Sequence, residues 1–508
     1  MKSETAVRVL VALPNNLGDV IMAGPVLEGL RLRYPDAGIA FLVEDGFEAG
    51  VLELPFCDEV LLFPRARIRA QLNEPCPHRG QGAVQEFVEE LQEKRFDRIV
   101  NLSQAPYVAY LLSLAGIGEY AGQQFLAQGQ LGVPDPWSRY LYAIPFARRY
   151  NKLHAVDVYR RIAGVRAHRG GYTIRLTTAE RDDARALLAR SGCGVGGNIV
   201  LLQPGAAFPS KCWPAQHCAA LGKLLVAQGW DVVVSGSPGE RSLCESIAQT
   251  VGGHSIAGRV SFRQALAVCS WARACVTPDT ALMHGAAAFD VPVFALFGPS
   301  SPVETGPWGE GHHIFSAQGC GERPCLCSEC RSQLCMKSLL PDVVYRALTG
   351  REGVTYGCDR YRTRLARDGD YSLEPCGVIS SPYGEEEGAE LVLRAFEVRG
   401  SGSARTGTES VVQSEWFLCR LMAMTQKLTA FLRDGNGSWV RAFEREREVC
   451  ASAGGINEFW MALLNLHLNS IPLLDARAGI ERSREACSEL AQRIRCALGS
   501  SAGWEDGS

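Results

Sequence analysis

Three turns of the chain place charged side chains beside glycine or other small residues. In the first, Asn15-Asn16-Leu17-Gly18-Asp19 follows an apolar run. A carboxylate such as that of Asp19 can remove a proton from a hydroxyl group as its oxygen attacks an electrophile, and Gly18 lets the backbone approach closely. An aspartate also suits the first turn of a helix for electrostatic reasons alone. This turn therefore predicts either a carboxylate that faces the ligand crevice or a plain helix start.

The second turn has the composition of a phosphate site. Residues 203–214, QPGAAFPSKCWP, combine Gly205 and other small residues with Lys211, just before a helix expected from Pro214. Free backbone amides, the start of a helix and a lysine together attract a phosphate. The alternative interpretation is a lysine on an exposed loop.

The third turn, residues 277–288 with the sequence TPDTALMHGAAA, also runs from an expected strand into an expected helix. Asp279 and Thr280 stand at the mouth of this helix, and His284 follows about one turn later on the same side. The small residues after His284 allow close packing. For Asp279 alone, capping of the helix is the alternative.

Apolar segments must position these turns. Strands are expected at residues 7–13, 39–43, 59–63 and 98–102, and after residue 198 at 199–203, 231–235, 274–277 and 291–297. Helical spacing covers residues 20–34, 84–94, 214–228, 240–249, 261–272 and 281–289. Strands that alternate with helices predict an α/β fold with two doubly wound parallel sheets. Ligands bind such sheets at the carboxyl ends of the strands, where all three turns lie.

Four segments in order resemble glycosyltransferase family 9, the ADP-heptose:lipopolysaccharide heptosyltransferases. They are LGDVIMAGPVLEGLRLRYP, LLQPGAAFPSKCWP, VVVSGSPGERSLCESIA and TPDTALMHGAAAFDVPVFALFGPSSP, and the resemblance covers roughly residues 7–345. It implies the GT-B architecture, in which two Rossmann-like lobes face a cleft. The acceptor would bind mainly the first lobe and the nucleotide sugar the second.

The resemblance also implies roles for single residues. Asp19 matches the proposed general base, and Lys211 matches the lysine at the donor diphosphate. The implied donor-binding residues are Lys211, Glu240, Asp279, Thr280 and His284. The backbone at Gly18 and Gly205 would contact the sugar and the phosphates. The chain departs from the family at Ala281, where glycine is common, and at residues 206–208, where hydroxyl residues are frequent.

These residues suit an inverting displacement that needs no divalent metal. Asp19 would activate an acceptor hydroxyl, while Lys211 and the helix start at Asp279-Thr280 stabilise the charge on the departing diphosphate. The expected donor is ADP-heptose and the expected acceptor a lipopolysaccharide core. Two alternatives stay open: an enzyme acting on a protein or another polysaccharide, and an inactive scaffold whose helical tail binds a partner.

Five cysteines lie close together: Cys320, Cys325, Cys327, Cys330 and Cys335. Thiolates at Cys-x2-Cys spacing favour zinc or iron, and some protein-modifying relatives of the family are known to hold iron through four cysteines. We expect a structural metal, bound by Cys327, Cys330 and Cys335 with Cys320 or Cys325. Reduced thiols or a disulfide are the alternatives.

Composition limits the remaining possibilities. The chain has 508 residues and a net charge of −3, which argues against a general nucleic-acid-binding protein. No apolar run is long enough to span a membrane, and no signal peptide is recognised. We expect a cytoplasmic protein, with peripheral contact at the inner face of the membrane as a further option.

Four regions are expected. Residues 1–170 form the acceptor lobe, 171–348 the nucleotide-sugar lobe with the cysteines, 349–410 a linker or irregular segment, and 411–508 a helical accessory domain. The last region rests on apolar stripes at helical spacing, one of which contains Cys487, Leu490, Ile494 and Ala497.

Overall fold

The computed structural model describes most of the first 376 residues. The described residues are 7–74, 78–116, 119–125, 131–146, 148, 151–166, 172, 174–194, 196–318, 324–325, 330, 332–351, 357–366, 369–376, 487–488 and 490–491. They belong to two compact units. The first comprises residues 1–103, 117–119 and 153–381, and the second comprises residues 104–116, 120–152 and 382–508.

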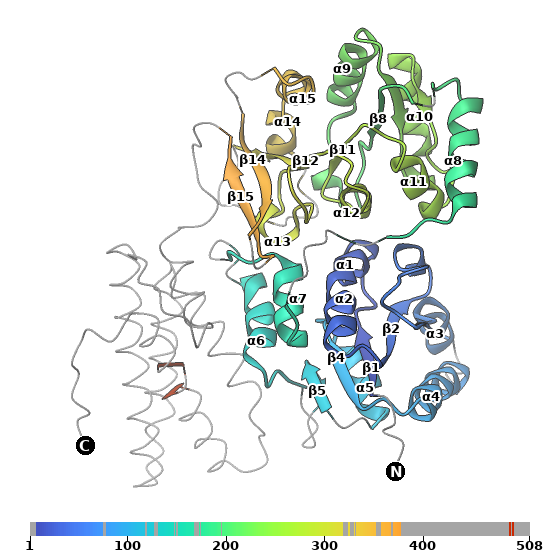
Figure 1. Ribbon diagram of the computed structural model, residues 1–508, viewed down its shortest axis with the longest axis vertical. Helices are drawn as coiled ribbons and strands as arrows, with labels where there is room; N and C mark the ends of the chain where they lie inside the picture. The colour runs from blue at the N-terminus through green and yellow to red at the C-terminus, as the bar shows by residue number, and fades with distance from the viewer. Residues whose placement is uncertain are drawn as a thin grey trace, which may run out of the picture. The chain divides into compact units, whose positions relative to one another are not determined.

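The first lobe of the first unit is built on a sheet with strand order β3-β2-β1-β4, and Figure 1 shows this lobe with its helices. Its strands are β1 (Arg8–Ala12), β2 (Gly38–Glu44), β3 (Glu59–Phe63) and β4 (Arg98–Asn101), and all four run parallel. Its helices are α1 (Leu17–Met22), α2 (Gly24–Arg33), α3 (Arg65–Leu72), α4 (His78–Glu93) and α7 (Ala155–Ala163), with a short turn η1 (Glu48–Gly50). After Arg8 the central strand β1 is apolar and buried, because helices cover both faces of a parallel sheet. Strand β5 (Glu119–Gly122) begins at the last residue of the segment 117–119 and continues into the second unit.

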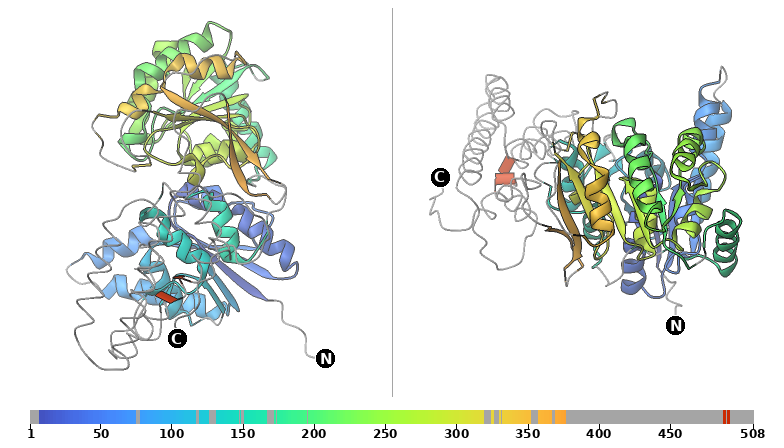
Figure 2. Two further views of the ribbon diagram at one scale, coloured as in Figure 1. Left: turned by 90° about the vertical axis from the view of Figure 1, so that its left-hand side faces the viewer. Right: turned by 90° about the horizontal axis from the view of Figure 1, so that it is seen from above.

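The second lobe is a larger sheet with strand order β10-β9-β8-β11-β12-β13-β14-β15. The strands are β8 (Ile199–Leu202), β9 (Asp231–Val234), β10 (His254–Ser255), β11 (Ala274–Pro278), β12 (Val293–Phe297), β13 (His313–Ala317), β14 (Cys358–Leu365) and β15 (Tyr371–Pro375). Strands β8 to β13 are parallel, as predicted for a doubly wound unit. Figure 2 shows both sheets between their helices.

Helices cover both faces of the second sheet. Helices α9 (Ala215–Val226), α10 (Arg241–Val251), α14 (Leu334–Ser338) and α15 (Pro341–Leu348) share one apolar core with alternate strand residues such as Val200 and Leu202. Helix α11 (Phe262–Cys269) contacts α8 (Thr178–Arg190) and α12 (Ala281–Ala288). Three short elements complete the lobe: η4 (Pro209–Lys211), η5 (Pro238–Glu240) and α13 (Pro302–Thr305).

The expectation of a linker or irregular segment at 349–410 is wrong for residues 358–375. Strands β14 and β15 there form an antiparallel hairpin that extends the second sheet. In β14, Tyr361 and Thr363 point inward, whereas Arg362 and Arg364 are exposed. This alternation has the period of a strand, but the mixture of threonine, aspartate and arginine hides it from a search for apolar residues.

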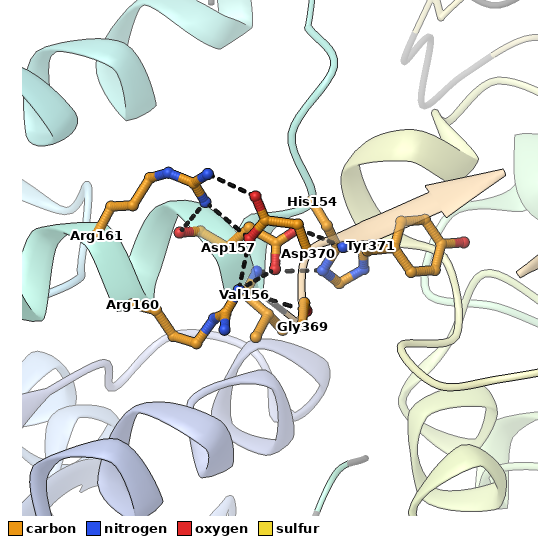
Figure 3. Close-up of polar contacts among 8 residues, drawn as sticks. All are labelled: His154, Val156, Asp157, Arg160, Arg161, Gly369, Asp370 and Tyr371. Atoms are coloured by element: carbon orange, nitrogen blue, oxygen red, sulfur yellow. Dashed lines mark hydrogen bonds and ion pairs between the residues drawn. The ribbon is translucent and has the colours of Figure 1, made fainter. Parts of the chain in front are cut away.

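A buried polar network, which we call the hairpin clamp, joins α7 of the first lobe to this hairpin (Figure 3). Asp157 accepts from Arg160 Nη2 at 2.8 Å and from the backbone N–H of Tyr371 at 2.9 Å. Asp370 accepts from Arg160 at 2.9 Å and from Arg161 at 2.6 Å. Burial raises the pKa of Asp157 to about 6, although Arg160 opposes this shift. The clamp therefore ties the second sheet to a helix of the first lobe.

The described part of the second unit contains α5 (Pro106–Leu114), β6 (Gln124–Phe125), β7 (Leu131–Gly132), α6 (Pro136–Ala143) and η2 (Ile144–Phe146). Asp135 caps α6 by accepting from the Ser138 N–H at 2.8 Å. Cys487 and Leu490, which the sequence assigned to one helical stripe, are helical and buried. The rest of the predicted helical domain at 411–508 lies outside the described residues. Among the described residues no helix is long and apolar enough to cross a membrane.

Candidate active site

A pocket of about 750 Å³ lies between the two lobes of the first unit. The first lobe contributes residues of the first predicted turn, including Gly18 and Asp19, together with Phe47. The second lobe contributes the other two turns. Its predicted site residues in the pocket wall are Lys211, Glu240, Asp279, Thr280 and His284. Of the predicted residues apart from the cysteines, only Gly205 is not part of this wall.

Asp19 lies in the first turn of α1, partly accessible from the pocket. Its Oδ2 accepts from Asn16 Nδ2 at 3.0 Å, and Asn16 occupies the N-cap position with a φ of 51°. The surrounding protein raises the pKa of Asp19 to about 6, because burial and the nearby carboxylates of Asp279 and Glu304 outweigh the Asn16 hydrogen bond and Lys211. A carboxyl group with this pKa can accept a proton near neutral pH.

Lys211 and Asp279 form an ion pair in the second lobe. The Lys211 ammonium is 2.6 Å from Asp279 Oδ2. Burial would raise the pKa of Asp279, but the Lys211 ammonium, which also donates a hydrogen bond to this carboxylate, outweighs the effect of burial and the net pKa is lowered. The loop that carries Lys211 is anchored by Trp213, a buried side chain whose indole N–H donates to the Leu339 carbonyl at 2.9 Å. The lysine is therefore held at the pocket rather than free on a loop.

Helix α12 brings Thr280 and His284 to the pocket. Thr280 is at the N-cap position, where its hydroxyl lies 3.0 Å from Thr277 Oγ1 and makes no side-chain capping bond. Burial lowers the pKa of His284 to about 4, so its ring is neutral at physiological pH. Helix α12 meets α1 closely: a Cβ on Gly18 would stand 3.3 Å from His284 Cδ2. Glycine at this position therefore permits the contact between the lobes.

Glu240 and Gly205 are neighbours. The Glu240 carboxylate accepts from the backbone N–H of Ser237 at 2.7 Å and from its hydroxyl at 2.8 Å, which closes a capping box. A Cβ built on Gly205 would overlap that carboxylate. Gly205 thus makes room for Glu240, while Ala206 and Ala207 face the pocket. A contact of the Gly205 backbone with phosphate stays a prediction.

Several pocket residues were not predicted. Phe208, 49% exposed, lies beside Lys211, with 5.8 Å between the ammonium and the ring centre. Thr305 also lines the pocket, and its neighbour Glu304 acts on the pKa of Asp19. Glu304 and Thr305 lie in α13, which a Gly-Pro-Ser-Ser-Pro segment joins to the end of β12. The end of a parallel strand was therefore the signal that could have revealed them.

Two cysteines of the predicted metal site, Cys320 and Cys327, lie outside the described residues, which include Cys325, Cys330 and Cys335. Cys335 is buried in the core of the second lobe, next to Met336. The Cys330 thiol is 3.3 Å from the Ser332 hydroxyl. Within the described part of the chain, no three potential ligands gather around one point. A structural metal at this cluster stays a prediction.

Comparison with known proteins points to one family. Residues 84–336 match the model of glycosyltransferase family 9 (heptosyltransferase). Lipopolysaccharide heptosyltransferase 1 of Pseudomonas aeruginosa is 29% identical over 332 residues, which cover 64% of this chain and 88% of that protein. A family 9 glycosyl transferase from Veillonella parvula superimposes with a TM-score of 0.59 at 20% identity, covering 68% of this chain and 97% of that one. The E. coli heptosyltransferase WaaC, solved with ADP, gives a TM-score of 0.50 at 20% identity, with 68% and 100% covered.

Proposed function

The chain belongs to glycosyltransferase family 9 and has its GT-B architecture of two Rossmann-like lobes, and we propose that it transfers a heptose from ADP-heptose to a lipopolysaccharide core. One observation carries this proposal. Asp19 from the first lobe lines the same pocket as Lys211 and Asp279 from the second. A base and a diphosphate-binding cation therefore face one volume, as transfer between a bound donor and a bound acceptor requires.

In the proposed reaction Asp19 removes the proton of the acceptor hydroxyl as its oxygen bonds to the anomeric carbon. The bond from that carbon to the diphosphate breaks on the opposite side, so the product has the inverted configuration. The raised pKa of Asp19 supports this role, since a carboxylate with a pKa near 6 is a stronger base than an exposed one and is still ionised at neutral pH.

ADP leaves with additional negative charge. Lys211 and the free backbone amides at the start of α12 can stabilise that charge. Because this chain supplies a cation and a helix terminus here, we propose that transfer needs no divalent metal. The reaction would occur in the cytoplasm, at the inner face of the membrane that presents the growing acceptor.

The test is to incubate the full chain with ADP-heptose and heptose-deficient lipopolysaccharide and to measure ADP release and the mass of the product. We expect release that requires both substrates and that Asp19→Asn lowers by about 100-fold or more, while ADP still binds. ADP release only with a protein or another polysaccharide would mean that this molecule, and not the lipopolysaccharide core, is the acceptor. No release with any nucleotide sugar would instead favour an inactive scaffold.

A further inference from the structure

Tyr172 lies in the segment that connects the two lobes. It does not line the pocket itself but contacts His284, which does. Its side chain is 4% exposed. The hydroxyl is 3.0 Å from His284 Nδ1, and the two rings meet edge to face with centres 5.4 Å apart. The phenol ring also packs against Trp308, which is fully buried. Tyr172 therefore holds the ring nitrogen of His284 that faces away from the pocket.

The surroundings decide which group donates this hydrogen bond. The Tyr172 hydroxyl is buried, and a buried O–H group that finds no acceptor costs free energy. Burial raises the pKa of Tyr172 well above its ordinary value, so the phenol keeps its proton. Among the described residues His284 Nδ1 is the one hydrogen-bond partner of this hydroxyl, so the phenol proton is donated there rather than left unsatisfied.

A neutral imidazole that accepts at Nδ1 carries its own proton at Nε2. That edge of the His284 ring faces the first lobe: a Cβ on Gly18 would be 3.6 Å from Nε2 and 3.3 Å from Cδ2. Both Gly18 and His284 line the pocket next to Asp19. The Nε2–H group is thus a donor directed to the space where the two substrates would meet.

We propose that Tyr172 is a positioning residue, which fixes the tautomer and ring orientation of His284 so that Nε2–H donates to an oxygen of the bound nucleotide sugar. Only the identity of this ligand rests on the proposed function. Both residues belong to the second lobe: the His284 hydrogen bond would hold the donor where α12 meets α1 of the first lobe, while Lys211 acts on the diphosphate. Through its hydrogen bond to His284, a residue of the connection between the lobes would thus act on a group in the pocket wall.

The tautomer is tested on the unmodified protein. The full chain labelled with ¹⁵N-histidine has nine histidines, and a His284→Asn variant assigns the signals of interest. At pH 7.5 we expect Nδ1 to be unprotonated and hydrogen-bonded and Nε2 to be protonated, with the Nε2 signal shifting when ADP-heptose is added. A protonated Nδ1 would overturn the proposal, whether or not the protein transfers heptose.

Kinetics test whether Tyr172 acts through His284. We expect Tyr172→Phe to lower kcat about tenfold, the usual effect of one lost hydrogen bond, with less than twofold change in the KM of the acceptor. In a His284→Ala background the same change should have almost no further effect. Equal losses in both backgrounds would mean that Tyr172 only supports the fold, and would refute the positioning role.

Tyr371→Phe is the matched control. Tyr371 is as buried as Tyr172, but its hydroxyl has no hydrogen-bond partner among the described residues, and its ring packs on His154. We expect its kcat to stay within twofold of the wild type. If the wild type shows no transfer at all, the proposed function fails, while the protonation of His284 still decides the role of Tyr172.

Discussion

The Lys211 ammonium lies 2.6 Å from the Asp279 carboxylate, so the cation assigned to the donor diphosphate is already paired within its own lobe. A bound diphosphate must share this cation with Asp279 or draw it away. The pair holds Lys211 at the pocket in the absence of donor, which reduces the conformational entropy lost on binding. Asp279 also limits the attraction that the pocket offers to other anions.

Removing the lysine should weaken nucleotide binding strongly. Lys211→Met deletes the cation and leaves the Asp279 charge facing the phosphates, so we expect the Kd of ADP to rise about 10- to 100-fold in calorimetric titration. Adding Asp279→Asn to this variant should restore part of the affinity. Lys223→Met, an exposed lysine of α9, serves as the control. An unchanged Kd for Lys211→Met would contradict the assignment.

The pH profile should report the ionisation of Asp19. Its pKa is raised to about 6, so the reactive carboxylate is lost as the pH falls through 6, and kcat/KM should decline with unit slope below that value. Asn16→Ala removes the hydrogen bond that favours the carboxylate and should move the acidic limb to higher pH. Asn73→Ala, at the end of α3, should leave the profile unchanged. A profile that is flat from pH 5 to 8 would exclude Asp19 as the base.

The hairpin clamp should contribute strongly to stability. Arg160→Met leaves Asp157 buried without its cation, at a cost of about 3 kcal/mol, so the thermal midpoint should fall by about 5 °C or more. The raised pKa of Asp157 determines how the loss of stability in Arg160→Met depends on pH. The loss is largest when this carboxyl is ionised, above about pH 6, and is smaller at pH 5. Calorimetric scans at pH 5 and pH 8 measure the difference.

An exposed ion pair of the same hairpin provides the control for this prediction. Arg364 pairs with Glu374 at 2.6 Å, but both side chains are about half exposed. Arg364→Met should therefore change the free energy of unfolding by less than about 1 kcal/mol. If it lowered the midpoint as much as Arg160→Met, the buried clamp would have no special role.

Gly205 should be needed to keep Glu240 in place. In Gly205→Ala the new methyl group overlaps the Glu240 carboxylate, which must leave its capping position beside the pocket. We expect ADP to bind about tenfold more weakly, comparable to the loss of one hydrogen bond. Gly239→Ala, whose Cβ would come no closer than 3.9 Å to the Ser237 hydroxyl, should bind ADP normally. Equal affinities of the two variants for ADP would mean that Glu240 does not contribute to nucleotide binding.

Local patterns predicted much of the fold and the position of the site. The apolar strand expected at 199–203 appears as β8, and that expected at 274–277 appears as β11. The helix expected over 20–34 is instead two helices, α1 and α2, which separate at Ala23 just before Pro25. Because every parallel strand ends at the same edge, a turn after such a strand could be assigned to the pocket from the sequence alone.

The sequence by itself determined residue types, periodicity and the order of the elements, since these depend on neighbours along the chain. The tertiary structure decided which distant groups meet. Arg160 pairs with Asp370 and Tyr172 bonds to His284 only because strands and helices remote in sequence pack together. The same packing sets the burial that raises the pKa of Asp19 and lowers that of His284, because the cost of burying a charge depends on all of the protein packed around it.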